Sequence, residues 1–165
     1  MGDMNDTIIN HDLFYGMKPG HLAILIEGAK TARFKAGELL FQEGEPANQF
    51  YLIQNGKIAL ETHETANHPI VLQTLGAGDV LGWSWLFPPF SWHFQARAVE
   101  TANVILLNGA NLLASAERDH DFGYELMKRV TQVIIRRLQA TRKQLVAHQA
   151  DAVPERSKLA PIIEG

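Results

Sequence analysis

Histidine is the side chain of this sequence with the widest range of chemistry, because its imidazole binds metals and haem and exchanges protons near neutral pH. None of the chain's histidines forms an H-x-H or H-x-x-x-H pair, which would place two imidazoles on one face of a strand or helix. We therefore expect histidines at the surface or at helix ends, and no metal site. The seven are His11, His21, His63, His68, His93, His120 and His148.

Aromatic side chains gather in residues 78–100, which hold all three tryptophans of the chain and no acidic residue between Asp79 and Glu100. Two interpretations stay open. In the first, the rings fill the interior as core. In the second, some of them line a site for an apolar or planar ligand, with His93, Gln95 and Arg97 as polar groups. The cluster consists of Trp83, Trp85, Phe87, Phe90, Trp92 and Phe94.

Several other kinds of chemistry are excluded or unsupported. The absence of cysteine excludes disulfides, thiolate metal sites, cysteine-bound iron–sulfur clusters and a cysteine nucleophile. The sequence has neither a recognisable Ser-His-Asp or paired-carboxylate pattern nor the H-x-H…E…H ligand set of cupins, so we expect no enzyme. A net charge of −3 gives no reason to expect nucleic acid as the main partner.

The sequence shows neither a secretory signal pattern nor a membrane-spanning stretch. Its N-terminus lacks a basic region followed by an apolar run, and no stretch approaches the roughly 18 apolar residues of a membrane span. We expect a cytoplasmic protein that makes no membrane contact.

Short β-type runs dominate the region that would position the aromatic cluster. Between about 34 and 107, apolar runs alternate with Gly, Pro and Asn at intervals of about ten residues, which is typical of an antiparallel sandwich or roll. Asn55-Gly56 is the strongest hairpin signal. Residues 19–30 read as a short helix. The fold class is therefore mainly β with flanking α-helices: an antiparallel double-stranded β-helix (β-roll or jelly roll) plus a long C-terminal helix.

The longest periodic element spans about 120–148, with Asp119 as a plausible N-cap. Two apolar stripes together cover an arc of roughly 160°, wider than one packing surface requires. We expect one stripe to contact the β domain and the other to form a homodimer, while a helix packed more deeply into its own domain is the alternative. The candidate interface residues are Leu126, Val130, Val133, Arg137 and Ala140; the second stripe holds Met127, Ile134, Leu138, Thr141 and Leu145.

These elements divide the chain into three parts. Residues 1–18 form an N-terminal arm, residues 19–148 form one domain, and residues 149–165, which contain two prolines, form a flexible tail.

The stretch "FKAGELLFQEGEPANQFYLIQNGKIAL" at 34–60, followed by Gly76, Gly78-Asp79 and Leu81-Gly82, resembles the cyclic-nucleotide-binding domain of Crp/Fnr-type bacterial regulators. The resemblance covers roughly residues 20–148. It implies a β-roll flanked by helices and a phosphate-binding cassette after Gly82. Crp/Fnr transcription factors also carry, after the long helix, a DNA-binding helix-turn-helix unit of roughly 50 to 60 residues, more than residues 149–165 offer, so no direct DNA binding is expected. In members that bind cAMP or cGMP, this cassette reads Gly-Glu, with a following Arg-Ser/Thr-Ala; the Glu binds the ribose hydroxyl and the Arg the cyclic phosphate.

This chain departs from that cassette at both charged positions. Gly82-Trp83 stands where Gly-Glu is expected, and His93-Phe94-Gln95-Ala96 spans the position of the arginine. Arg97 lies one residue beyond the nearest match, so its side chain would face the other side of a strand unless it acts as a displaced phosphate ligand. Some relatives in the Fnr branch also lack the pair and do not rely on a cyclic nucleotide.

We therefore expect a stand-alone regulatory or sensor module that signals through an unidentified partner protein, with no certain cofactor. A protein that binds cAMP or cGMP through an altered cassette, or a sensor of another small-molecule effector, apolar or planar, are the alternatives. A ligand would lie between the cassette and the start of the long helix. The candidate ligand-binding residues are Leu81, Gly82, Trp83, Ser84, Trp85, His93, Phe94, Gln95, Arg97, Tyr124 and Lys128.

Overall fold

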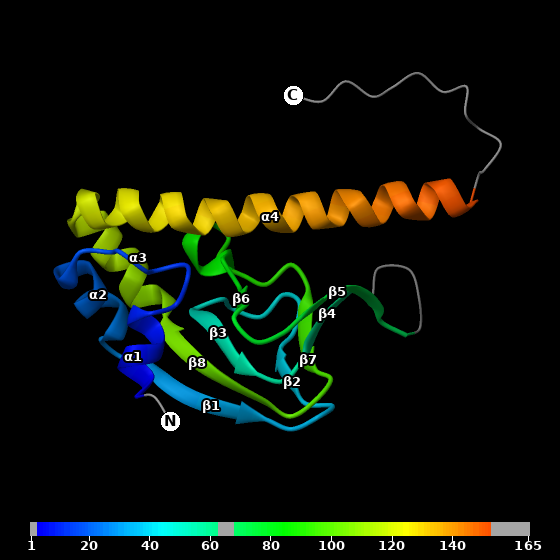
Figure 1. Cartoon of the computed structure of the whole chain (residues 1–165), viewed down its shortest axis with the longest axis horizontal. Coiled ribbons are helices and arrows are strands. Elements are labelled where there is room, and N and C mark those ends of the chain that lie inside the picture. Colours follow the sequence, from blue (N-terminus) through cyan, green and yellow to red (C-terminus); the bar gives the residue numbers. More distant parts are fainter. Residues whose placement is uncertain (1–2, 63–67, 153–165) are drawn as a thin grey trace, which may run out of the picture. The chain divides into compact units, whose positions relative to one another are not determined.

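The structure is a computed structural model that describes residues 3–62 and 68–152. It divides into two units, one up to Val133 and one from Ile134 onward. The first unit contains every strand of the described residues and is built from two four-stranded sheets with helices at one end (Figure 1). Mainly antiparallel sheets with flanking helices and a long C-terminal helix are the fold class that the sequence predicts.

The first sheet has the strand order β1-β8-β3-β6, with every pair antiparallel. Successive residues of β3 face opposite sides, because a strand alternates its side chains. Phe50 packs against Phe14 and Trp85 on the helical side, whereas Tyr51 packs against Phe41 of the other sheet. The strands are β1 (Lys30–Phe34), β8 (Ala102–Asn108), β3 (Gln49–Asn55) and β6 (Val80–Leu81).

The second sheet has the order β2-β7-β4-β5 and completes the roll. Its inner strand β4 is buried along its whole length, as expected for a strand covered on both faces. The strands are β2 (Leu39–Phe41), β7 (Gln95–Ala98), β4 (Ile58–Thr62) and β5 (Ile70–Leu75).

The hairpin predicted at Asn55-Gly56 is wrong, although the turn is there. β3 pairs with β8 and β6, whereas β4 pairs with β5 and β7, so the turn carries the chain from one sheet to the other. Gly56 has φ +92°, and a Cβ atom there would clash with the Thr101 carbonyl oxygen. The glycine is therefore required by a crossing between sheets, which local sequence cannot distinguish from a hairpin.

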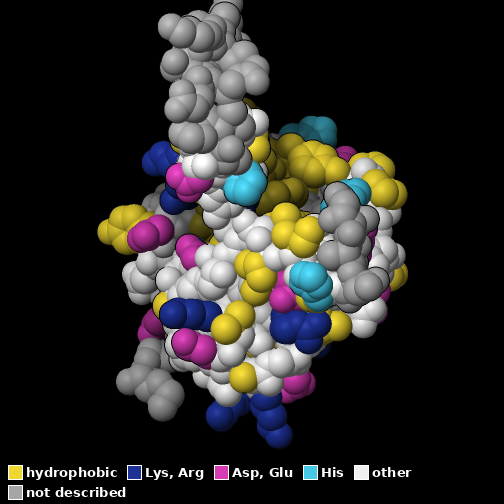
Figure 2. Space-filling model, turned by 90° about the vertical axis from the view of Figure 1, so that its right-hand side faces the viewer, with side chains coloured by type: hydrophobic (Ala, Val, Ile, Leu, Met, Phe, Trp, Pro, Cys, Tyr) yellow, Lys and Arg dark blue, Asp and Glu magenta, His cyan; other side chains and the backbone are white. Residues whose placement is uncertain are grey.

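Strand β5 is an edge strand, and its apolar side chains Ile70, Val71 and Leu72 are 41%, 55% and 43% exposed. Figure 2 faces the side of the molecule that carries β4 and β5 in Figure 1, and hydrophobic side chains are interspersed there with charged ones. Strand β5 itself carries no charged side chain, whereas many exposed edge strands carry charges that discourage pairing.

Short helices cover one end of the roll. Ile8 and Phe14 are fully buried, so the segment before residue 19 packs into the first unit, which differs from the arm that the sequence boundaries describe. The helix predicted at 19–30 ends at Ile26, and strand β1 begins at Lys30. The helical elements are α1 (Met4–Ile9), α2 (Pro19–Ile26), the 3-10 turn η1 (Ser84–Leu86) and α3 (Gly109–Arg118).

Helix α4 (His120–Ala152) begins as predicted, with the Asp119 carboxylate accepting hydrogen bonds from the backbone N–H groups of Asp121 and Phe122. It is longer than predicted, and the remainder of the proposed tail, 153–165, lies outside the described residues. Leu126 and Val130 are 0% and 1% exposed within the first unit. None of the helices in the described ranges combines the length and hydropathy of a membrane-spanning segment.

Candidate functional site

The cassette segment, Gly82–Phe94 between β6 and β7, holds all three tryptophans, and two of them lie inside the protein. Trp85 is 1% exposed; its indole N–H donates to the Gly82 carbonyl oxygen at 2.7 Å, and its ring lies 5.5 Å from that of Phe50. A Cβ atom on Gly109 would lie 2.6 Å from Trp85. The start of α3 therefore packs directly on this indole, and Trp85 is a core residue.

Trp92 fills the space between the two sheets. Its ring stacks on Phe41 with 3.8 Å between centroids and 14° between planes, and Tyr51 completes the cluster. Gly82, at φ +90°, lies so close that a Cβ atom would meet the Trp92 ring at 2.6 Å. The Trp92 indole thus occupies the inside of the roll, against Gly82 at the start of the cassette segment.

The other members of the aromatic cluster lie nearer the surface. Trp83 and Phe94 are half-buried, Phe87 and Phe90 are 43% and 39% exposed, and His93 is exposed. Leu81 and Ser84 are buried. The structure therefore splits the cluster, with its interior members serving as core and its outer members bordering solvent.

Gln95 and Arg97, predicted as polar groups of a ligand site, both contact one carboxylate. Glu61 on β4 is 6% exposed, and its Oε1 accepts from Gln95 Nε2 at 2.7 Å and from Arg97 Nε at 3.2 Å. Arg97 also donates to the Gly37 carbonyl oxygen at 2.9 Å. The register explains this arrangement, because Gln95 lies opposite Glu61 and Arg97 lies opposite Ala59 on the same face.

Glu61, Phe41 and Tyr51 also belong to this region, although the sequence does not single them out. The only local signal for Glu61 is a carboxylate inside the apolar run "IALET", and the two aromatic residues lie within the matched stretch 34–60 without any mark of contact with Trp92. Long-range register brings these residues together.

Burial raises the pKa of Tyr51 to about 12, and the negative charge of Glu45 adds to the effect. The neutral phenol is therefore favoured in the folded state, so its contribution to stability is complete below pH 10 and is lost as the pH rises toward 12. At pH 11 we expect about 1 kcal/mol less stability than at pH 8 from this group. Urea unfolding at both pH values checks this, and the Tyr51→Phe variant should show a smaller loss. Equal losses in both proteins would contradict it.

A cavity of about 340 Å³ lies where the cassette segment meets α3 and the first turns of α4. Its walls are mainly apolar, and two polar side chains, Glu117 and His120, also line it. Tyr124 is 70% exposed, and the Lys128 ammonium lies 5.8 Å from the centre of its ring. Tyr124 therefore shares this cavity with Leu86 and Phe87 of the cassette segment, and Lys128 lies beside it outside the lining; their role in ligand binding stays a prediction. The apolar walls include Leu86, Phe87, Leu113, Tyr124 and Met127.

Within residues 3–62 and 68–152, no three His, Asp or Glu side chains gather as a metal site would require. His63 lies outside the described residues. His21 is buried; its Nδ1 lies 3.7 Å from a Glu125 carboxylate oxygen, which is 3.9 Å from Arg129 Nε. Arg129 donates to the carbonyl oxygens of Leu13 and Tyr15. This group ties the N-terminal segment and α2 to α4.

Comparison with known proteins agrees with this architecture. A cAMP-activated global transcriptional regulator from Mycobacterium tuberculosis is 24% identical over 142 residues, or 86% of this chain, which spans 62% of that regulator. A cyclic nucleotide-binding domain from Methylobacillus flagellatus has a TM-score of 0.72 at 14% identity, covering 96% of this chain and 84% of that one.

A more distant fold relative is the regulatory subunit of a cAMP-independent protein kinase A from Trypanosoma brucei. Its TM-score is 0.62 at 16% identity, covering 77% of this chain and 45% of that one. The sequence model of the cyclic nucleotide-binding domain matches residues 31–119, from β1 through the cassette segment to the end of α3. With this match over more than half of its length, the chain belongs to the cyclic nucleotide-binding domain family.

Proposed function

We propose that this chain is a signalling module that regulates a partner protein and whose cassette does not bind cyclic nucleotides. The observation that carries the proposal is the ion pair between Arg97 and Glu61. Arg97 is the only lysine or arginine between Gly82 and Ala98, and its charge is already compensated by a buried carboxylate. We assign no catalytic activity to the module, and a cytoplasmic location stays a prediction.

Electrostatics and packing both support the loss of nucleotide binding. Burying a phosphate anion without a matching cation costs several kcal/mol, and a nucleotide would have to compete with Glu61 for Arg97. The ring of Trp92 is also stacked on Phe41 inside the roll. A ligand entering there would have to displace a packed indole, at a further cost in apolar burial.

The relatives leave both outcomes open. The regulator from Mycobacterium tuberculosis is cAMP-activated, and the kinase subunit from Trypanosoma brucei is cAMP-independent. The same fold therefore occurs in a cAMP-activated protein and in a cAMP-independent one. Whether this chain binds a nucleotide depends on its own cassette residues.

A titration with cAMP and with cGMP, followed by tryptophan fluorescence, tests the proposal. All three indoles lie in the cassette segment, so a ligand there changes their environment. We expect no saturable change up to millimolar nucleotide and no shift in Tm, because binding to the folded state alone would raise Tm. Saturation at micromolar nucleotide would show that Arg97 or backbone amides still hold the phosphate.

The cavity beside Tyr124 supports a second candidate function, the sensing of a small apolar or planar molecule. Its volume of about 340 Å³ falls within the range of small-molecule sites, and its walls are mainly apolar. We expect 1-anilinonaphthalene-8-sulfonate to bind there, and Met127→Glu to weaken binding by placing a charge in the apolar wall. Val99→Glu, at an apolar residue exposed elsewhere, is the control. Equal binding to both variants would place the probe outside this cavity.

We further propose a homodimer, with its interface moved along α4. Leu126, Val130 and Val133 are buried within their own protomer, so the first stripe serves the domain core. Arg137 and Ala140, the other predicted interface residues, are half-buried. The second stripe remains for a partner copy: Ile134, Leu138, Thr141 and Leu145 repeat at spacings of four and three, and Leu138 and Leu145 are 66% and 57% exposed.

Sedimentation velocity tests the dimer through a single substitution. Leu138→Glu places a charge at the centre of the second stripe and should convert the dimer to monomer, because two such carboxylates would face each other across the interface. Gln139→Glu, one residue further along the same helix, adds the same charge and should leave the dimer intact. A monomeric wild-type protein would contradict the dimer, and a dimeric Leu138→Glu variant would place its interface elsewhere.

A further inference from the structure

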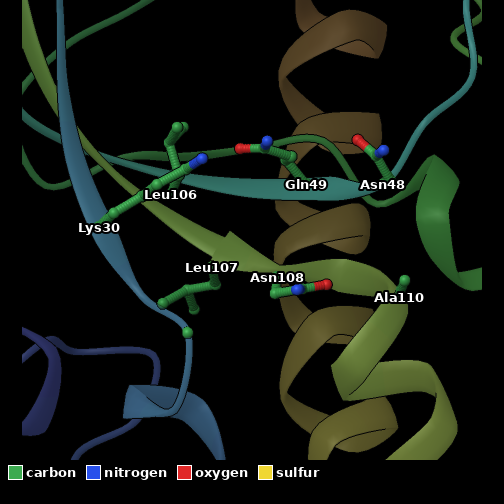
Figure 3. Close-up of a pocket in the computed structure, with 8 residues that line it drawn as sticks. Lys30, Asn48, Gln49, Leu106, Leu107, Asn108 and Ala110 are labelled. Carbon is green, nitrogen blue, oxygen red and sulfur yellow. The ribbon is translucent and has the colours of Figure 1, made fainter.

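A second cavity, of about 300 Å³, lies on the first sheet beside the start of α3. It shares no residue with the cassette segment or with the cavity at Tyr124. Figure 3 shows its lining side chains, which come from β1, β3, β8 and their ends. Those with a bearing on binding are Lys30, Asn48, Gln49, Leu106 and Asn108.

The strongest sign of a ligand is an unsatisfied acceptor in the wall. The carboxamide oxygen of Gln49 is buried and accepts no hydrogen bond. Buried polar atoms are nearly always paired, so this oxygen calls for a donor supplied from the cavity. Figure 3 shows the polar ends of the Lys30 and Gln49 side chains pointing toward each other. Any group between them would meet a cation and an acceptor together.

The remaining polar groups extend this pattern. Asn108 is the N-cap of α3, because its Oδ1 accepts a hydrogen bond from the Asn111 backbone N–H at 3.0 Å. Its amide nitrogen remains as a donor. Asn48 adds another carboxamide. Carboxamides offer a donor and an acceptor side by side, which matches hydroxyl groups, since each hydroxyl both donates and accepts. No acidic side chain lines the cavity.

From this arrangement we infer that the cavity is a binding site for a small polyhydroxylated molecule that carries one anionic group. The anionic group pairs with the Lys30 ammonium and the Asn108 amide, and a hydroxyl donates to Gln49 Oε1. The volume is at the low end for ligand sites and fits a molecule of monosaccharide size. A sugar acid and a sugar phosphate share this chemistry, and they differ in whether a carboxylate or a phosphate reaches Lys30.

Binding in this cavity would change the surroundings of Trp85, the core residue of the cassette segment. The backbone N–H of Gly109 donates to the Asn48 carbonyl oxygen at 2.9 Å, and Gly109 packs against Trp85. A ligand that orders Asn48 and Asn108 therefore acts on the residue next to Trp85, so the fluorescence of this indole is a natural reporter.

Isothermal titration calorimetry with four probes tests the site. Gluconate and glucose 6-phosphate carry both the hydroxyls and the anion, sorbitol lacks the anion, and hexanoate lacks the hydroxyls. We expect at least one of the first two to bind, and sorbitol and hexanoate to bind at least about tenfold more weakly, because each loses one set of hydrogen bonds. Binding of gluconate alone identifies a carboxylate ligand, and binding of glucose 6-phosphate alone identifies a phosphate ligand.

Variants tie the binding to this cavity. Lys30→Gln and Gln49→Leu should each weaken the tighter probe by about tenfold or more. Lys35→Gln removes an exposed lysine outside the cavity and should leave binding unchanged. The inference is overturned if neither anionic polyol binds at millimolar concentration, if sorbitol binds as well as gluconate, or if Lys30→Gln and Lys35→Gln behave alike.

Discussion

Replacing Trp85 with alanine should lower the free energy of unfolding by about 4 kcal/mol, the largest effect that we expect from a substitution in the cassette segment. The indole is 1% exposed and packs on Phe50 and on the Gly109 backbone. Its removal leaves a cavity that the rigid start of α3 cannot fill. It also leaves the Gly82 carbonyl oxygen without its 2.7 Å hydrogen bond. Equilibrium unfolding in urea, followed by circular dichroism, measures the loss.

Trp83→Ala is the matched control, because it removes the same side chain two residues away. Trp83 is half-buried, so we expect a loss of about 1 kcal/mol. Similar losses at the two positions would mean that both indoles are core. A loss below about 1 kcal/mol at Trp85 would mean that its ring is free to move, as expected for the wall of an occupied ligand site.

This contrast between two tryptophans could not be predicted from the sequence. In regular strands the period of two assigns each side chain to a face. Between Gly82 and Phe94 the chain follows a short 3-10 turn and irregular backbone, so neighbouring aromatic residues have no common period. Both interpretations of the cluster were therefore open, and packing against Phe41, Phe50 and Gly109 assigned Trp85 and Trp92 to the core.

More of the fold than of the site could be predicted from the sequence, because the signals for its strands and helices are local. The glycine-punctuated β runs, the Asp119 cap and the apolar periodicity of α4 predict the roll and the long helix. The pairing of strands distant in sequence could not be predicted in this way. Gln95 and Glu61 are 34 residues apart and meet only through the register of β4 with β7. The same limit explains the wrong hairpin at Asn55-Gly56, where the turn was identified but its strand partners were not.

The stripe on α4 illustrates a further limit. The spacing of Leu126, Val130 and Val133 predicts a packed face but not its partner, which could be the protomer's own core or a second copy. Burial of all three within the first unit assigns them to the core and leaves the second stripe to be tested for dimerisation.

Removing the cation beside Glu61 should produce the second large effect. In Arg97→Met the Glu61 carboxylate stays buried with Gln95 as its remaining hydrogen-bond donor, and we expect a loss of about 2 kcal/mol at pH 7. This is less than a fully buried pair would cost, because the Arg97 side chain is 35% exposed and water screens its charge. Arg33→Met, at an exposed arginine on β1, should change stability by less than about 0.5 kcal/mol.

The double variant Glu61→Gln/Arg97→Met separates the charge from the packing. Glutamine keeps the shape of Glu61 without its negative charge, so the double variant should recover at least about 1 kcal/mol relative to Arg97→Met alone. Recovery would mean that Arg97 chiefly neutralises a buried carboxylate, which leaves little of its charge for a phosphate. A double variant no more stable than Arg97→Met would assign the effect to packing, and Arg97 would again be available as a ligand for an anion.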